Sequence, residues 1–160
     1  MSIWGALAGG FAGTLVLATI LRTASEARLT RIDLPFLLGT AITSNRRRAK
    51  VIGYLAHFGI GMVFALIYYG LFVAIGHSGW GLGALFGFVH GMFSATALVN
   101  VLLPAVHPRM GTSFSAADSS PLIEPPGFLM RNYGRSTPIV SLAAHVLYGA
   151  IVGGFVALSN

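Results

Sequence analysis

The stretch Leu55-Ala56-His57-Phe58-Gly59-Ile60-Gly61 decides the fold class of this chain, because it places a histidine inside an apolar run long enough to cross a membrane. A second stretch, Ala143-Ala144-His145-Val146-Leu147-Tyr148-Gly149, repeats the pattern, again with a glycine four residues after the histidine. Ionisable side chains at membrane depth are expensive and are candidates for a functional site. The sequence therefore predicts a membrane protein in which two similar halves each supply one such histidine.

Composition supports this class. Of the 160 residues, 55% are hydrophobic and only 9% are charged, whereas soluble domains carry about 25% charged residues. Four apolar runs have the roughly 20 residues needed to span a bilayer, and they cover Ile3–Leu21, Val51–Ile75, Trp80–Leu103 and Ile139–Leu158. We expect one all-α transmembrane domain, residues 1–160, with Pro104 and Pro108 ending the third run.

The basic residues indicate the orientation of these spans. Seven of the ten lie between the first two runs, from Arg22 to Lys50, and the other three lie between the last two, from Arg109 to Arg135. Cytoplasmic loops of membrane proteins carry an excess of Lys and Arg. We therefore expect a bacterial inner (plasma) membrane protein with both long loops cytoplasmic and both termini outside. The charge of +6 is explained by topology, so it does not indicate nucleic acid as a partner.

Each long loop contains a short apolar segment with an acid and a proline. These segments are Ile32–Gly39, with Asp33, and Ile123–Met130, with Glu124. Both are too short to span a membrane, so we expect interfacial or re-entrant segments.

An internal repeat connects the two halves, repeat 1 covering about 1–76 and repeat 2 about 79–160. Besides the histidine stretches, the glycines of the first and third runs match in spacing: Gly5, Gly9 and Gly13 correspond to Gly83, Gly87 and Gly91. Both halves enter the membrane with the same polarity, which predicts two tandem helix pairs related by a pseudo-two-fold axis along the membrane normal. His57 and His145 would then face one another at equal depth, and Asp33 and Glu124 would form a symmetric pair.

Three interpretations of the histidines remain open. In the first, each buried ring, including His90, is satisfied by a loop acid, a backbone carbonyl or a neighbouring helix. In the second, His57, His145 and His90 hold a cofactor such as a haem or pigment, or His57 and His145 join Asp33 and Glu124 in a metal site. The Glu-x-x-His motif of di-iron bundles is absent from the sequence. In the third, the histidines and acids line a path for protons or a solute.

Recognisable enzyme motifs are missing, and without cysteine there is no thiolate chemistry. Enzymatic activity stays open, although nothing predicts one. The leading hypothesis is a non-catalytic accessory or structural subunit, docking through its small-xxx-small glycine faces onto other membrane subunits or a second copy in the bilayer. The alternatives are a cofactor-bearing subunit and a small proton- or solute-translocating protein.

One resemblance adds to this reading. The stretch Ala144–Gly149 followed by Gly153, with Pro126-Gly127-Phe128 and Asn132-Tyr133-Gly134 before it, resembles the closing region of uncharacterised small bacterial inner-membrane proteins, the YagU-like and related domain-of-unknown-function families. The resemblance covers about the last forty residues. It implies a four-helix inner-membrane protein, no established activity and no catalytic residue.

Overall fold

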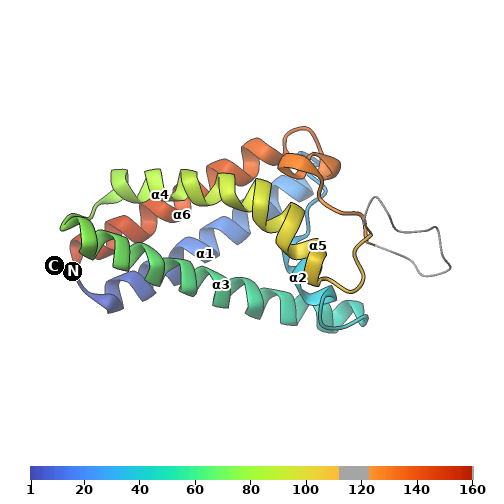
Figure 1. The fold of residues 1–160 in the computed structure, drawn as a ribbon, viewed down its shortest axis with the longest axis horizontal. Helices are drawn as coiled ribbons and strands as arrows, with labels where there is room; N and C mark the ends of the chain where they lie inside the picture. Colours follow the sequence, from blue (N-terminus) through green and yellow to red (C-terminus); the bar gives the residue numbers. More distant parts are fainter. Residues whose placement is uncertain (112–122, 160) are drawn as a thin grey trace.

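The computed structural model describes residues 1–111 and 123–159. Four helices within them are long and apolar enough to cross a membrane. They are α1 (Ile3–Glu26), α3 (Arg46–Ile75), a third span from Trp80 to Val106, and α6 (Thr137–Leu158). The start of α1 and the end of α6 lie together at one end of the bundle, here called the terminal end (Figure 1). The predicted all-helical fold with four helices of membrane-spanning length is thereby confirmed.

The opposite end, here called the loop end, holds the longer connections and the short helix α2 (Leu34–Thr40). Asp33 caps α2 by accepting a hydrogen bond from the backbone N–H of Phe36, and Asn45 caps α3 in the same way through Arg48. Such caps satisfy backbone donors that the first helical turn leaves free. The apolar part of the first loop is thus a seven-residue helix, and α3 begins within the basic cluster.

The third span is not one regular helix. It consists of α4 (Trp80–Phe93), a π-helical stretch η1 (Ser94–Leu102) and α5 (Leu103–Val106). Within this stretch the Asn100 side-chain amide donates to the backbone carbonyls of Ala95 and Thr96. The expectation that Pro104 ends this run is wrong. Pro104 lies in the first turn of α5, where a missing N–H is tolerated.

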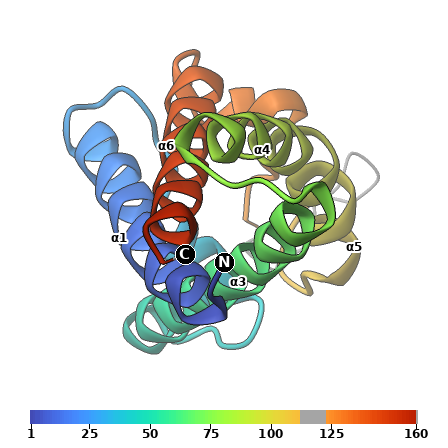
Figure 2. The same ribbon diagram turned by 90° about the vertical axis from the view of Figure 1, so that its left-hand side faces the viewer.

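Glycine brings α4 against α6 at backbone contact distance. A Cβ atom added to Gly83 or Gly87 would collide with the carbonyl oxygens of Gly149 and His145. The glycines of α1 also face α6, with Gly9 against Val152 and Phe155. Figure 2 shows α6 between α1 and α4. Both glycine faces are therefore used inside the molecule, and docking onto a partner stays a prediction without support from these faces.

This packing also bears on the predicted pseudo-two-fold axis. Under that axis α3 would correspond to α6 and would pack against α1 and α4 as extensively as α6 does. Instead, α6 packs extensively on both α1 and α4, while α3 packs mainly on α1 and α2. The duplication and its axis therefore stay predictions.

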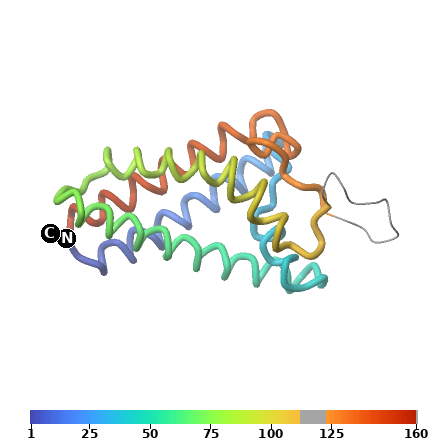
Figure 3. Tube along the Cα trace, in the orientation of Figure 1, coloured from blue at the N-terminus to red at the C-terminus, as the bar shows by residue number. Residues whose placement is uncertain are grey.

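Side chains beyond the spans hold the loop end together. The buried His107 ring lies 3.1 Å from the Leu37 carbonyl oxygen and 3.3 Å from the Thr40 hydroxyl, through Nε2. Arg109 donates to the Thr40 carbonyl at 2.6 Å. Both residues follow α5 in sequence, so they fasten the end of the third span to α2. In Figure 3 the trace runs from α4 through η1 towards α2.

The glycine contact between α4 and α6 yields a test within one helix. We expect Gly87→Ala to destabilise the fold by about 1–3 kcal/mol, because the new methyl group must push two backbones apart. The matched control is Gly81→Ala, also on α4, where an added Cβ meets nothing within 4 Å. That change should stabilise the helix by up to about 1 kcal/mol. Unfolding of both variants in mild detergent, followed by circular dichroism, measures the difference, and equal stabilities would contradict the packing described.

Candidate functional site

The spanning helices enclose a cavity of about 320 Å³ towards the loop end, here called the bundle cavity. Most of its wall is apolar. Its polar lining side chains are Thr14, His57, His90, Ser94, Ser141, His145 and Tyr148. No charged side chain belongs to its lining in the part of the chain that the structure describes. The structure thus brings the three membrane histidines of the sequence prediction to one space.

The bundle cavity exists because the third span changes direction. Gly83, Gly87 and Gly91 hold α4 against α6. Beyond Phe93 the π-helical stretch η1 leaves α6, and α5 ends beside α2. The space that opens is lined by side chains of η1, among them Ser94, Leu98 and Leu102. π-helical segments are rare and are frequent at functional sites.

Two of the histidines have partners. His90 lies 3.2 Å from the Tyr68 hydroxyl through Nδ1 and stacks on Phe64 with ring centroids 3.6 Å apart. The expectation that His90 is satisfied across a helix pair agrees with this contact between α4 and α3. His145 lies 2.7 Å from the Ser141 carbonyl oxygen through Nδ1, so Nδ1 carries the proton. Its other nitrogen, Nε2, then accepts hydrogen bonds when the ring is neutral.

His57 is different. Its ring is only 7% exposed, and its Nδ1 has no hydrogen-bond partner. The hydroxyl of Ser94, on η1, is likewise buried without a partner. A buried polar atom without a partner costs about 1–3 kcal/mol, and such atoms are rare in folded proteins. Both residues line the bundle cavity, although the two unpaired atoms themselves have almost no exposed surface.

The mouth of the bundle cavity faces sideways, between α3 and the end of the third span. Three of its lining residues are also exposed on the outer surface: Ile60 at 37%, Leu102 at 49% and Val106 at 75%. All three are apolar and belong to membrane-spanning segments. The opening therefore faces the region that lipid would occupy.

The loop acids lie apart from the bundle cavity. Asp33 pairs with Lys50 at 3.1 Å, and Glu124 pairs with Arg31 at 3.6 Å. Neither acid lines the bundle cavity, although Asp33 and His57 share a second, smaller cavity. Among the described residues no group of three or more acids and histidines could hold a metal ion. The predicted metal set of His57, His145, Asp33 and Glu124 is thus not assembled.

Glu124 instead belongs to a loop cluster with Arg31 and Tyr133. The Tyr133 hydroxyl donates to the Glu124 backbone carbonyl at 2.6 Å, and the Arg31 backbone N–H donates to the Tyr133 carbonyl. Burial, together with the nearby Glu124 carboxylate, raises the pKa of Tyr133 to about 12. The hydroxyl therefore stays a neutral donor, and this cluster connects the two loops.

A flat cofactor fits only some histidine pairs. The rings of His90 and His145 contact one another, with centroids 4.8 Å apart and planes at 80°. No macrocycle can lie between two rings in direct contact, so these two cannot be its opposite axial ligands. His57 has no such ring contact with His90 or His145 in the described structure, and its ring meets Phe58 instead.

Several residues of this site were not found from the sequence. Ser94, Ser141 and Tyr148 bring polar atoms to the bundle cavity, yet single hydroxyl groups in apolar runs give no distinctive signal. The spacing of Ser141 four residues before His145 is the one pattern that could have indicated their contact. Nothing in the sequence indicated that η1 would diverge from α6.

The Tyr148 hydroxyl donates to the Gly61 carbonyl, which connects α6 to α3 beside the histidines. We expect Tyr148→Phe to reduce the free energy of unfolding by about 0.5–1.5 kcal/mol, because a buried hydrogen bond is lost. The matched control is Tyr69→Phe, whose hydroxyl makes only a 3.5 Å contact with the Met1 carbonyl at the surface. Denaturation in detergent compares the two, and an equal loss in both would show that the α3–α6 contact contributes nothing.

Comparison of the chain with protein-family models, with curated proteins and with solved structures found no match. The resemblance of the last forty residues to small inner-membrane proteins therefore stays a prediction, and the function is argued from the cavity alone.

Proposed function

We propose that this protein is a membrane-embedded binding protein that takes a neutral, lipid-soluble molecule from the bilayer into the bundle cavity. The observation that carries the proposal is the mostly apolar wall of that cavity, to which His57, His90 and His145 bring polar side chains. The proposal extends the interpretation in which the histidines hold a cofactor. We prefer it to the accessory-subunit hypothesis, because the glycine faces on which that hypothesis relies already contact other helices of the same molecule.

The lining defines the chemistry of the molecule. Because the described lining contains no charged side chain, a charged group would lose its hydration without compensation. A neutral hydroxyl or carbonyl group suits the polar side chains of the wall, which include His57 and Ser94 as well as His145, whose Nε2 is an acceptor. The rest of the molecule should be apolar, to match Leu98, Leu102 and the other aliphatic walls.

Size and access support the same class. Ligand pockets commonly measure about 300–1,000 Å³, so a cavity of about 320 Å³ suits a small ring or a short part of a chain. The apolar mouth at Ile60, Leu102 and Val106 allows any remaining tail to extend into lipid. A bacterial inner membrane with cytoplasmic loops remains our proposal for the location, supported by the Lys and Arg residues of the loop end.

The proposal predicts that purified protein carries a bound molecule. We expect organic extracts of the wild type to contain one neutral compound in stoichiometric amount, identified by mass spectrometry. His57→Phe keeps a ring but removes both nitrogens, and should reduce retention by about threefold to tenfold, which corresponds to one lost hydrogen bond. Without ligand this variant should be as stable as the wild type or more so, because the unpaired nitrogen is gone.

The matched control for that experiment is His77→Phe, since His77 is exposed in the turn between α3 and α4. It should leave retention unchanged. Equal extracts from the His57→Phe protein and the wild type would contradict the proposal. A visible absorption band that disappears in both His57→Ala and His145→Ala would replace the proposed neutral molecule with a pigment or haem.

A further inference from the structure

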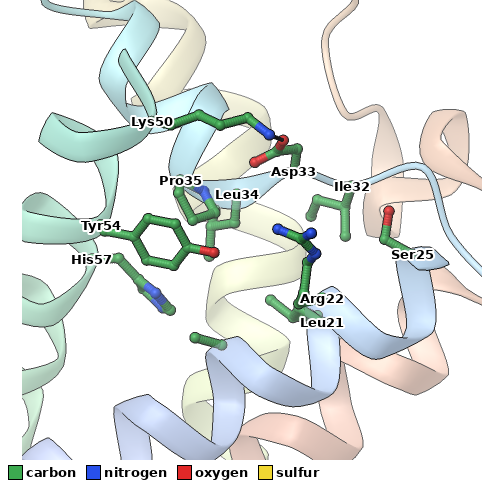
Figure 4. A pocket seen from close by; sticks show the side chains of 11 residues that line it. Leu21, Arg22, Ser25, Ile32, Asp33, Leu34, Pro35, Lys50, Tyr54 and His57 are labelled. Carbon is green, nitrogen blue, oxygen red and sulfur yellow. Dashed lines mark ion pairs between the residues drawn. The ribbon is translucent and has the colours of Figure 1, made fainter. Parts of the chain in front are cut away.

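A second cavity of about 220 Å³ lies at the loop end, between α1, α3 and the start of α2, and is here called the entry cavity. Figure 4 shows its side chains. Unlike the bundle cavity, it is rich in polar groups, which are Arg22, Ser25, Asp33, Lys50 and Tyr54. Charged groups in this number need hydration. Because Arg22, Asp33 and Lys50 are also substantially exposed, the entry cavity is open to water on the loop side.

His57 lies in the walls of both cavities. Three other residues are shared, Leu21, Ile32 and Leu34, and all are aliphatic. Among the described residues, His57 is thus the polar side chain that separates the hydrated entry cavity from the bundle cavity. An imidazole ring has two nitrogens and can present one of them to each side.

The opposite side of the histidine cluster is closed by packing. Phe72, Val152 and Val156 are fully buried towards the terminal end. Phe72 stacks on Phe86 with centroids 5.1 Å apart, and Tyr68 meets the same ring edge-on. These side chains fill the bundle beyond His90, so the histidines have no comparable polar approach from that end within the described structure.

We infer that the entry cavity is a one-sided water route to His57, through which the bundle cavity exchanges protons with water on the loop side only. The access itself does not depend on a ligand; only the presence of a bound molecule rests on the proposed function. The route makes the protein asymmetric across the membrane, and it does not support the hypothesis of a continuous path for protons or a solute.

The exchange needs no redox partner. Water in the entry cavity gives a proton to the nitrogen of His57 that carries the lone pair, and the resulting imidazolium returns a proton to that water. The ring thereby exchanges its N–H proton and ends neutral, and the bound molecule keeps its own protons. The charged and titratable groups around His57 are Arg22 on α1, Asp33 before α2, Lys50 and Tyr54 on α3, His90 on α4, and His145 and Tyr148 on α6.

The sequence makes an accessibility test simple, because the chain contains no cysteine. Single variants Tyr54→Cys, His57→Cys and Val152→Cys would be reacted with a charged, membrane-impermeant thiol reagent in vesicles of both orientations. We expect Tyr54→Cys and His57→Cys to react from the loop side at least about tenfold faster than Val152→Cys, because reaction needs a hydrated thiolate. Ser44→Cys and His77→Cys report the loop side and the terminal side respectively.

The outcomes separate this inference from the proposed function. Reaction of His57→Cys from the terminal side, or failure to react while Tyr54→Cys reacts, would overturn the one-sided route even if a ligand co-purifies. If His57→Cys does not fold, a second comparison replaces it. Tyr54→Cys is then labelled with and without the additional change Leu21→Trp. Tryptophan at the shared wall should slow that labelling, and unchanged labelling would count against a route along Leu21.

The proton exchange has its own readout. In protein with ¹⁵N-labelled histidine, the Nδ1–H of His145 should exchange with heavy water through His57. We expect His57→Phe to slow this exchange by about tenfold, whereas His77→Phe leaves it unchanged. Nuclear magnetic resonance spectra recorded over time after dilution into heavy water measure both rates. Equal exchange in wild type and His57→Phe would show that His57 is not the connection.

Discussion

The backbone contact between α4 and α6 is the constraint on which the rest of the structure depends. Without a side chain at Gly83 and Gly87, the two helices approach until carbonyl groups of α6 occupy the space of the missing Cβ atoms. Small residues have this effect in membranes, where close van der Waals packing replaces the hydrophobic effect between helices. Because the same helix α6 also receives the glycine face of α1, three spans become one rigid unit.

The position of α3 follows from that unit. α6 is occupied on two sides, so α3 packs mainly on α1 and α2, and the third span crosses towards α2 after Phe93. The change to π-helical structure at Ser94 allows this departure. The bundle cavity is therefore a consequence of tight packing at one end of the bundle and divergence at the other. His107 and Arg109 then fix the diverging end to α2.

Much of this architecture could be predicted from the sequence, because length and hydropathy alone determine the four spans. The importance of the glycine faces could also be predicted, but their partner could not. A stripe such as Gly5, Gly9 and Gly13 shows that something approaches closely, and it carries no information on which helix that is. Likewise, the apolar pattern of the third span does not distinguish a π-helical stretch from an α-helical one, so the divergence at Ser94 could not be predicted.

The candidate site was predicted only in part, because a sequence shows the type of a residue but not its neighbours in space. Histidine is conspicuous in an apolar run, so His57, His90 and His145 could be selected by type, and the structure places all three around one cavity. The acids Asp33 and Glu124 were selected by type as well, but each forms an ion pair with a basic residue of the loop end. In a loop rich in Lys and Arg, an ion pair at the surface forms without removing a carboxylate from water, whereas a buried metal site must offset that cost.

Energetics connects the remaining features of the site. A cavity between apolar walls forfeits contacts between them, and unpaired buried atoms at His57 and Ser94 add about 1–3 kcal/mol each. Two such costs in the same place are hard to reconcile with a purely structural part of the bundle, because small changes of side chain would remove both. Proteins break local rules of packing and polar satisfaction mainly at functional sites. Under the proposed function, a molecule in the cavity restores contacts with its walls, so its binding and the stability of the fold would be thermodynamically linked.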